Sequence, residues 1–383
     1  LYWEGRNGVA TLGVYFSSLC GASDVPTITN LAFVADIFRF AFCFGANDIG
    51  SSTLDPMLIR WSDQEDVANW TPAATNQAGS LRLSDGTEIV DAIQARQEIL
   101  VWSDAALYGL QYLGAPEVWG AQLLGANITI ASPNAAVYSN NIAYWMGVST
   151  FYYYDGTVKT LPCDVRSYVF DDFNQDQADQ VVCGPNEQFD EIWWFYCSAG
   201  ATQNDRYVVY NYVENVWYYG TLARSAWLDS DLRDFPVAAT FGCKLVNHEK
   251  GVDDNEFGTP TAFTANITSA QFDLDDGDRF MLLTKMLPDL TFEGSTADSP
   301  AATMTLNPLE NSGSGRYDPA SVGGNSSATV TRTAVVPVEA FTGQVFTRVR
   351  GRQMSIKIES TAVGVTWKLG APRMDMRPDG RRG

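Results

Sequence analysis

Short runs of aromatic and β-branched residues, separated by turn residues, constrain this chain more than any other feature of its sequence. The 383 residues include 11 Trp, 17 Tyr and 20 Phe, and these fall in runs bounded by Gly, Asn, Asp and Pro. Such runs are typical of antiparallel strands joined by tight turns. Long helical periodicity is absent, and residues 171–181 are the best candidate for a short helix or loop. The chain is therefore predicted to be all-β.

Groups of three or four predicted strands recur along residues 1–258. The central strands of three groups carry Trp102, Trp145 and Trp194, at spacings of 43 and 49 residues. Antiparallel units of about 40–50 residues with a central aromatic are typical of β-propeller blades. We expect these three side chains to fill equivalent core positions of successive blades. The blades are predicted near residues 31–83, 90–128, 134–165, 180–222 and 236–258, the last with a strand over 238–245 that contains Cys243.

About six blades are expected, because residues 1–16 look like outer strands of a further blade that begins upstream. The sequence starts without an initiator Met, which is consistent with additional N-terminal sequence. A large β-sandwich with coincidental spacing is the alternative fold for this region.

A second domain is predicted over residues 259–383, where the strands become longer. Clean alternation of apolar and polar residues, as in Met354–Glu359, is typical of antiparallel strands with one solvated face. We therefore expect a C-terminal β-sandwich. Its strands are predicted at 261–274, 279–292, 302–307, 328–338 and 346–376.

The charge distribution limits which classes of molecule this chain is expected to bind. The net charge is −20, so a surface that binds nucleic acid by releasing counterions is disfavoured. Residues 348–383 carry nine basic and three acidic side chains, which leaves −26 on the rest of the chain. Such a split favours docking of the basic segment on a neighbouring copy, with a solvated basic terminus as the alternative. The candidate contact residues are Arg348, Arg350, Arg352, Arg381 and Arg382.

Catalytic and metal-binding signals are weak. The single histidine, His248, has no nucleophile motif beside it and is interpreted as a loop or interdomain residue. The turn containing Asp273, Asp275 and Asp278 departs from the EF-hand pattern and is a weak candidate for a structural cation. The six cysteines are scattered without metal-ligand spacing and are interpreted as reduced core residues. We expect no enzymatic activity and no cofactor.

A membrane anchor is not expected either. The longest apolar stretch, 31–46, is interrupted by Asp36 and Arg39 and is shorter than the roughly 20 residues that a spanning helix needs. The first ten residues lack the basic start and apolar core of a signal peptide.

Ten segments along nearly the whole chain together resemble one protein family. They are Asp55–Glu65, Asn69–Pro72, Gln77–Leu83, Arg96–Trp102, Leu107–Tyr108, Tyr144–Gly147, Glu191–Cys197, Asp205–Tyr210, Gly351–Met354 and Arg377–Arg382. In these segments the chain is similar to virion structural proteins of tailed bacteriophages. None of the segments is a catalytic motif.

The resemblance implies a propeller-containing nozzle or hub of a short-tailed phage, assembled in the host cytoplasm and located in the virion tail. It implies a homo-oligomeric ring, a hexamer, with other tail proteins such as an adaptor or a fibre as partners. Double-stranded DNA is expected to pass through without specific binding, because an acidic inner wall repels phosphates.

Two other functions remain open at this point: a receptor- or glycan-binding propeller on the phage tail, and a propeller glycosidase. Aromatic side chains gathered at one propeller mouth favour binding, whereas aromatic side chains buried between blades favour a structural scaffold.

Overall fold

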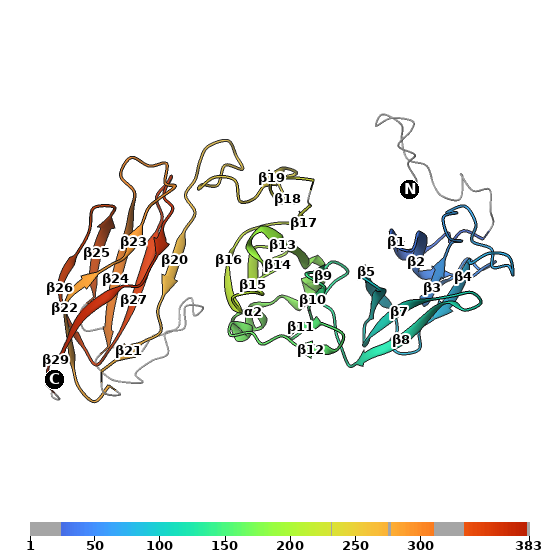
Figure 1. Cartoon of the computed structure of the whole chain (residues 1–383), viewed down its shortest axis with the longest axis horizontal. Coiled ribbons are helices and arrows are strands. Elements are labelled where there is room, and N and C mark those ends of the chain that lie inside the picture. The colour runs from blue at the N-terminus through green and yellow to red at the C-terminus, as the bar shows by residue number, and fades with distance from the viewer. Residues whose placement is uncertain (1–23, 231, 275–276, 310–332, 381–383) are drawn as a thin grey trace. The chain divides into compact units, whose positions relative to one another are not determined.

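A computed structural model describes residues 24–230, 232–274, 277–309 and 333–380 of the chain. It divides into two compact units, residues 1–248 and 249–383, shown in Figure 1. The first unit ends at His248, before the predicted start of the second domain at residue 259. Arg381, Arg382 and Asp275, together with the expected blade over residues 1–16, lie outside the described residues.

Unit 1 consists of antiparallel sheets whose strands follow one another in chain order. Four sheets have four strands and one has three among the described residues. They are blade 1, β1 (Thr29–Ala35), β2 (Phe40–Asn47), β3 (Leu54–Trp61) and β4 (Gly79–Arg82); blade 2, β5 (Ile89–Gln94), β6 (Glu98–Ser103), β7 (Ala106–Gly114) and β8 (Val118–Ala126); blade 3, β9 (Ala136–Ser139), β10 (Ile142–Met146), β11 (Phe151–Tyr154) and β12 (Val158–Thr160); blade 4, β13 (Val182–Asn186), β14 (Glu191–Tyr196), β15 (Arg206–Asn211) and β16 (Val216–Thr221); and blade 5, β17 (Ala226–Leu228), β18 (Val237–Ala239) and β19 (Leu245–Asn247).

The first strands of successive sheets contact one another in order, β1 with β5, β5 with β9, β9 with β13 and β13 with β17. Sheets that meet through their first strands in this way are the blades of a β-propeller. Local turn chemistry fits the arrangement. Asn140 and Asn141 join β9 to β10 with positive φ angles of 49° and 61°. Two-residue hairpin turns whose twist matches that of the strands require positive φ at both positions. Unit 1 is therefore a β-propeller, as predicted.

Apolar side chains fill the space between blades. One core cluster joins blades 2, 3 and 4 and another joins blades 1 and 2. Aromatic rings make many of the contacts. Phe42 and Trp119, from blades 1 and 2, meet edge-on with ring centroids 5.1 Å apart, an arrangement that the charge distribution of aromatic rings favours. The first and last blades of the described series keep exposed apolar side chains, with Val34 58% and Leu245 78% exposed.

Blade 5 differs from its expected form. It begins at Ala226, and the predicted strand over 238–245 is wrong. Cys243 has a φ of +60° in a turn between β18 and β19 and its side chain is exposed. Left-handed backbone interrupts a strand, so Cys243 is neither a strand residue nor a core residue.

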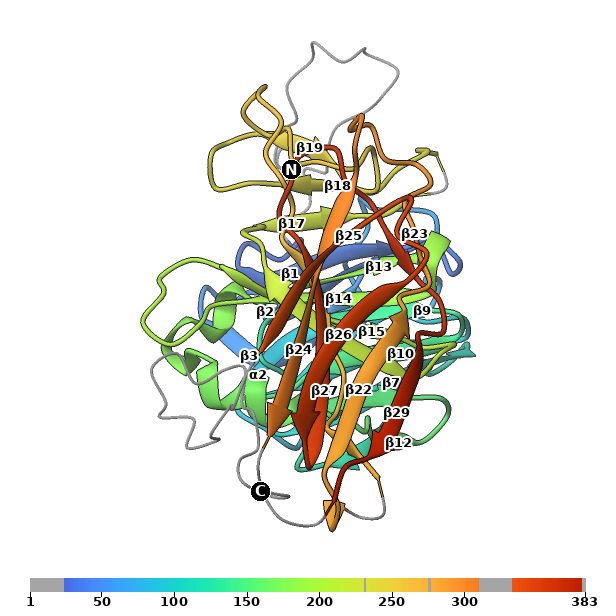
Figure 2. The same cartoon turned by 90° about the vertical axis from the view of Figure 1, so that its left-hand side faces the viewer.

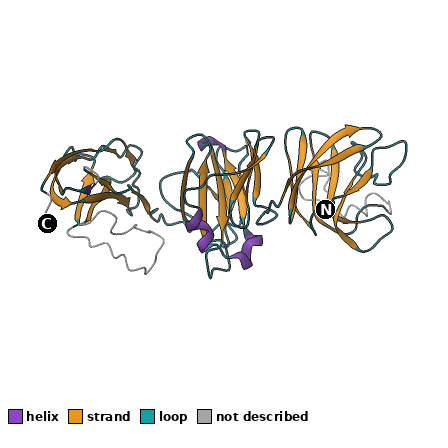
Figure 3. Ribbon diagram, turned by 90° about the horizontal axis from the view of Figure 1, so that it is seen from below, coloured by secondary structure: helices purple, strands orange, loops and turns teal. Residues whose placement is uncertain are grey.

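Helical segments are few and short among the described residues (purple in Figure 3). The connection between blades 3 and 4 contains α2 (Arg166–Asp172) and the 3₁₀ helix η2 (Gln175–Gln180), and η3 (Glu187–Phe189) follows β13. The predicted helix candidate at 171–181 thus covers η2 and only the end of α2. No helix in the described ranges is long and apolar enough to span a membrane.

Unit 2 is a β-sandwich, as predicted. One sheet has the order β20-β27-β24-β25, with β21 paired to β27, and a second has the order β26-β22-β29. A third, small sheet pairs β23 with β28. The strands of this unit can be followed in Figure 2. Methionine, leucine, isoleucine and valine side chains of both larger sheets share one core. The strands are β20 (Ala265–Thr268), β21 (Phe272–Asp273), β22 (Met281–Leu287), β23 (Leu290–Thr291), β24 (Ala301–Leu309), β25 (Ala334–Glu339), β26 (Val345–Gly351), β27 (Gln353–Ser360), β28 (Lys368–Leu369) and β29 (Arg373–Pro378).

The expectation of one long strand over 346–376 is wrong, because the chain changes sheets near Gly351. β26 pairs with β22 in one sheet, and β27 pairs with β24 in the other. A Cβ atom on Gly351 would lie 2.8 Å from the Gln353 carbonyl oxygen and from Pro308 Cβ. Glycine therefore permits the close backbone approach at this crossing.

Candidate interaction site

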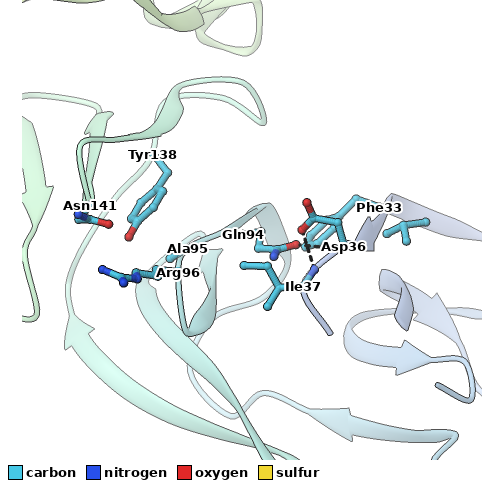
Figure 4. A pocket seen from close by; sticks show the side chains of 9 residues that line it. Phe33, Asp36, Ile37, Gln94, Ala95, Arg96, Tyr138 and Asn141 are labelled. Carbon is cyan, nitrogen blue, oxygen red and sulfur yellow. Dashed lines mark hydrogen bonds between the residues drawn. The ribbon is translucent and has the colours of Figure 1, made fainter. Parts of the chain in front are cut away.

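A hollow of about 590 Å³ lies where blades 1, 2 and 3 turn from their first to their second strands (Figure 4). Its lining comes from the end of β1 and the turn after it, from the end of β5 and the turn after it, and from β9 and its turn. The lining residues are Phe33, Val34, Asp36, Ile37, Gln94, Ala95, Arg96, Tyr138 and Asn141.

Polar groups of the hollow form two sides. On one side the Asp36 backbone N–H donates to Gln94 Oε1 at 3.1 Å, which joins the turns of blades 1 and 2. On the other side Arg96, Tyr138 and Asn141 point toward one another (Figure 4). Arg96 is exposed and forms no ion pair among the described residues, so its guanidinium remains available to a ligand.

The chemistry of the hollow suits binding better than hydrolysis. Asp36 is the single carboxylate of its lining, which also contains no His, Cys, Ser or Thr. Glycoside hydrolysis by the usual route requires two carboxyl groups on opposite sides of the sugar, and acyl transfer requires a nucleophile beside a base. Guanidinium, amide and phenol groups can hydrogen-bond a polar ligand.

Asp91 is a buried ionisable residue that the sequence prediction missed. It lies on β5, is 4% exposed, and its Oδ2 has no hydrogen-bond partner within the part of the chain that the structure describes. Its Oδ1 accepts from the Ala92 backbone N–H at 2.8 Å. Burial raises the pKa of Asp91 to about 8, because an apolar environment disfavours the charged carboxylate. A sequence signal existed, since Asp91 interrupts the apolar run Ile89–Ile93.

Asp91 also influences a partly buried thiol on blade 4. Burial, and secondly the charge of Asp91, raise the pKa of the Cys183 thiol. Cys183 lies on β13 and packs against the core that joins blades 2, 3 and 4. A high pKa keeps a thiol protonated and unreactive, so Cys183 is not a candidate nucleophile.

The three predicted blade-core tryptophans lie on the second strands of blades 2, 3 and 4. Trp102, Trp145 and Trp194 are each 0% exposed and belong to one core cluster. The rings of Trp102 and Trp145 meet edge-on with centroids 5.3 Å apart. Their indole N–H groups differ: Trp145 donates to Thr129 O at 3.2 Å and Trp194 to Ala135 O at 3.1 Å, whereas Trp102 Nε1 has no partner within the described residues.

His248 lies at the end of unit 1. Its Nε2 accepts from Arg224 Nε at 2.9 Å, and its ring lies 4.6 Å from that of Trp227. A ring nitrogen that accepts from an arginine carries no proton, so Nε2 of His248 serves here as a hydrogen-bond acceptor. The position matches the expected interdomain residue.

The acidic turn of unit 2 is only partly described. Asp273 Oδ2 accepts from Gln353 Nε2 at 3.0 Å, and the Asp278 carbonyl oxygen accepts from Arg352 at 2.7 Å. Within the described residues no group of three His, Cys, Asp or Glu side chains is placed to hold a metal ion. The cation site therefore stays a weak candidate.

The predicted basic contact residues are in different situations. Arg350 pairs with Asp379 at 2.6 Å, and its guanidinium lies 3.9 Å from the Phe280 ring centroid. Arg352 lies over the same ring at 4.6 Å. Both are thus held within unit 2, whereas Arg348 is exposed.

No protein-family model and no curated protein matches the sequence. Several solved structures are similar in part. Hsv2 of K. marxianus is 9% identical, with a TM-score of 0.32 over 54% of this chain and 58% of that chain. The extracellular domain of the putative one component system BT4673 of B. thetaiotaomicron is 8% identical, with a TM-score of 0.35 over 57% and 27%. Dihydro-heme d1 dehydrogenase NirN in complex with DHE is 11% identical, with a TM-score of 0.38 over 68% and 53%. Similarities at this level do not bear on function.

Proposed function

We propose that this chain is a structural component of a tailed-phage virion, most specifically a subunit of the tail nozzle or hub. In this proposal copies of the chain form a ring around the channel through which DNA leaves the particle. The resemblance of the ten segments, from Asp55–Glu65 to Arg377–Arg382, supplies the biological setting.

One observation supports the structural role: the tryptophan side chains of the propeller pack within and between blades rather than around a mouth. Among the described residues seven tryptophans are buried and the others are partly buried. A sugar-binding platform needs its aromatic faces in contact with solvent. Here the rings instead stabilise the packing of one blade on the next, which suits a rigid structural protein.

The net charge of −20 fits a conduit protein. An acidic surface repels DNA phosphates and gains nothing from counterion release. DNA is therefore expected to pass without being bound.

The direct test is whether the chain is present in purified particles of the phage that encodes it. Mass spectrometry of gradient-purified virions is expected to detect the chain at a fixed stoichiometry to the other tail proteins. A chain that stays in the lysate while the particles are complete and infectious would refute the proposal.

Absence of hydrolytic activity is a second expectation. The purified chain should not release products from host capsule, lipopolysaccharide or peptidoglycan, because the hollow contains a single carboxylate, Asp36. Reproducible turnover that disappears in Asp36→Asn, with the protein still folded by circular dichroism, would overturn this expectation.

The hollow itself favours one competing function, the binding of a polar ligand such as a glycan. Arg96, Tyr138 and Asn141 supply the necessary donors and acceptors. Glycan-array binding that is lost in Arg96→Ala would support that role.

A further inference from the structure

One face of the sandwich in unit 2 collects basic side chains. The sheet β26-β22-β29 packs Met281, Leu283 and Met286 into the core, so alternate positions on its strands lie on the opposite, outward face. Figure 2 shows β22 and β29 side by side. The basic residues on the outward face are Lys285, Arg348, Arg350, Arg373 and Arg377.

Strand register brings these residues together. Lys285 lies opposite Phe346 on one side and Asp375 on the other, and Leu282 lies between Arg350 and Arg377. The hydrogen bond from Arg377 lowers the pKa of Asp375, and the charge of Lys285 contributes to the same shift. These groups therefore share one patch, which we name the basic face.

Three cations of the basic face form no close ion pair within the part of the chain that the structure describes. Arg377 pairs with Asp375 at 3.2 Å, and Arg350 pairs with Asp379 at 2.6 Å. Lys285, Arg348 and Arg373 form no ion pair among the described residues. The sheet that contains β27 differs, because its outward-facing Lys357 forms an ion pair with Glu359 at 2.6 Å.

Exposed apolar side chains accompany the charge. Phe346 on the outer strand β26 lies opposite Lys285 and is 75% exposed, and Leu287 at the end of β22 is 37% exposed. Arginines around an exposed aromatic are the composition of a protein interface rather than of a solvated surface. A partner for this face must therefore supply carboxylates as well as apolar contact.

The complementary surface lies on the propeller. Residues 1–248 contain 28 acidic and eleven basic side chains, a net charge of −17. In an up-and-down blade, the turns between second and third strands and the connections to the next blade lie at the same end. The connection between blades 3 and 4 exposes Asp164, Asp171, Asp176 and Asp179 at that end, with Arg166 as its single basic residue.

We propose that the basic face of one copy docks head-to-tail on this acidic end of the propeller of a second copy. The proposal rests on the ring-forming role inferred above and assigns the surfaces that form the contact. A contact between two different surfaces generates a ring when the rotation closes. The charges set orientation and association rate, and the exposed side chains of Phe346 and Leu287 contribute buried apolar area.

The test uses full-length chains in sedimentation velocity at low and moderate salt. The triple variant Lys285→Glu, Arg348→Glu, Arg373→Glu is expected to weaken self-association at least about tenfold, with a larger effect at low salt. A matched control, Arg233→Glu, Lys250→Glu, Lys368→Glu, has the same change in charge at exposed cations elsewhere. It should weaken self-association much less.

Charge exchange makes the test specific. A second variant, Asp171→Lys, Asp176→Lys, Asp179→Lys, should also lose self-association. A mixture of the two triple variants should recover a hetero-association, because the reversed basic face of one meets the reversed acidic end of the other. No recovery on mixing, or equal loss in the matched control, overturns the proposal.

Two further outcomes also overturn it. One is a wild-type chain that stays monomeric at tens of micromolar in low salt. The other is tight binding of duplex DNA that the basic-face variant abolishes, since this assigns the face to nucleic acid. Failure here leaves the virion role standing if the chain is present in particles, whereas its absence from particles refutes the proposed function itself.

Discussion

At the scale of single residues, Trp102, Trp145 and Trp194 lie on the second strands of three blades but differ in the hydrogen bonding of their indole N–H groups. All are fully buried, but Trp102 has no acceptor for its indole N–H within the described residues, while Trp194 donates to the Ala135 carbonyl. A buried donor without a partner costs free energy, and removing it recovers part of that cost.

Replacement by phenylalanine should therefore separate the two positions. Both Trp102→Phe and Trp194→Phe leave a cavity, but Trp194→Phe also loses a hydrogen bond. We expect Trp194→Phe to lower the free energy of unfolding by about 1 kcal/mol more than Trp102→Phe, measured by urea denaturation. A larger loss for Trp102→Phe would show that its N–H is bonded.

Asp91 should impose a pH dependence on stability. Its folded pKa is raised to about 8, above the roughly 3.9 of an unfolded chain. Between these values the folded state holds a proton that the unfolded state has lost, so stability falls as pH rises from about 4 to 8 and then levels off. The slope from this group reaches about 1.4 kcal/mol per pH unit.

Asp91→Asn is the matching experiment. The amide is uncharged at every pH, so unfolding free energies measured from pH 5 to 9 should lose this slope, and the variant should gain most over wild type at pH 8 and above. An identical pH profile in the two proteins would show that Asp91 is ionised and solvated in the folded state.

The sequence alone predicted the burial of large side chains correctly, but it did not predict which groups surround an individual residue in the fold. A tryptophan at the centre of a short apolar strand has few alternatives to burial, which is why Trp102, Trp145 and Trp194 were recognisable. Asp91 interrupts a local apolar run, but the proximity of its charge to Cys183 on blade 4 depends on the tertiary fold. The hollow likewise combines turns from three blades, so its members share no motif.

At the scale of elements, Gly184 and Trp227 join blade 4 to blade 5. The Trp227 ring stacks on Trp193 at 5.4 Å and donates its N–H to Pro185 O at 2.7 Å. A Cβ atom on Gly184 would lie 2.1 Å from Trp227 Cδ1. The absence of a side chain at position 184 therefore allows this tryptophan to lie against β13.

Gly184→Ala should consequently displace blade 5. We expect a loss of about 1–3 kcal/mol, the range for overpacking a core, together with faster proteolysis within residues 226–248. Gly343→Ala is the control, because its Cβ would meet nothing within 4 Å. Equal stability of the two variants would show that Trp227 does not pack on Gly184.

At this scale, longer strands could be located from the sequence and very short strands could not. Six-residue apolar strands such as β6 and β14 have a clear pattern, and the paired asparagines at 140–141 identify the turn between β9 and β10. The three-residue strands of blade 5 offer too little alternation to locate. The sheet change at Gly351 was missed because β26 and β27 alternate continuously on either side of it.

At the scale of the whole molecule, the chain consists of a strongly acidic propeller unit and a sandwich unit with a basic face. In the proposed assembly, this division would let copies of a chain with a net charge of −20 associate, because complementary surfaces offset their mutual repulsion. The proposed contact surfaces are built from several strands and a connection between blades, so no single sequence motif identifies them.

A three-dimensional reconstruction of the virion proposed to contain this chain tests the central claim most directly. We predict repeated copies arranged as a ring around the tail channel, with the face bearing Lys285, Arg348 and Arg373 against the propeller of the next copy. A single copy attached at the periphery, or a channel lined by that basic face and DNA, would contradict it.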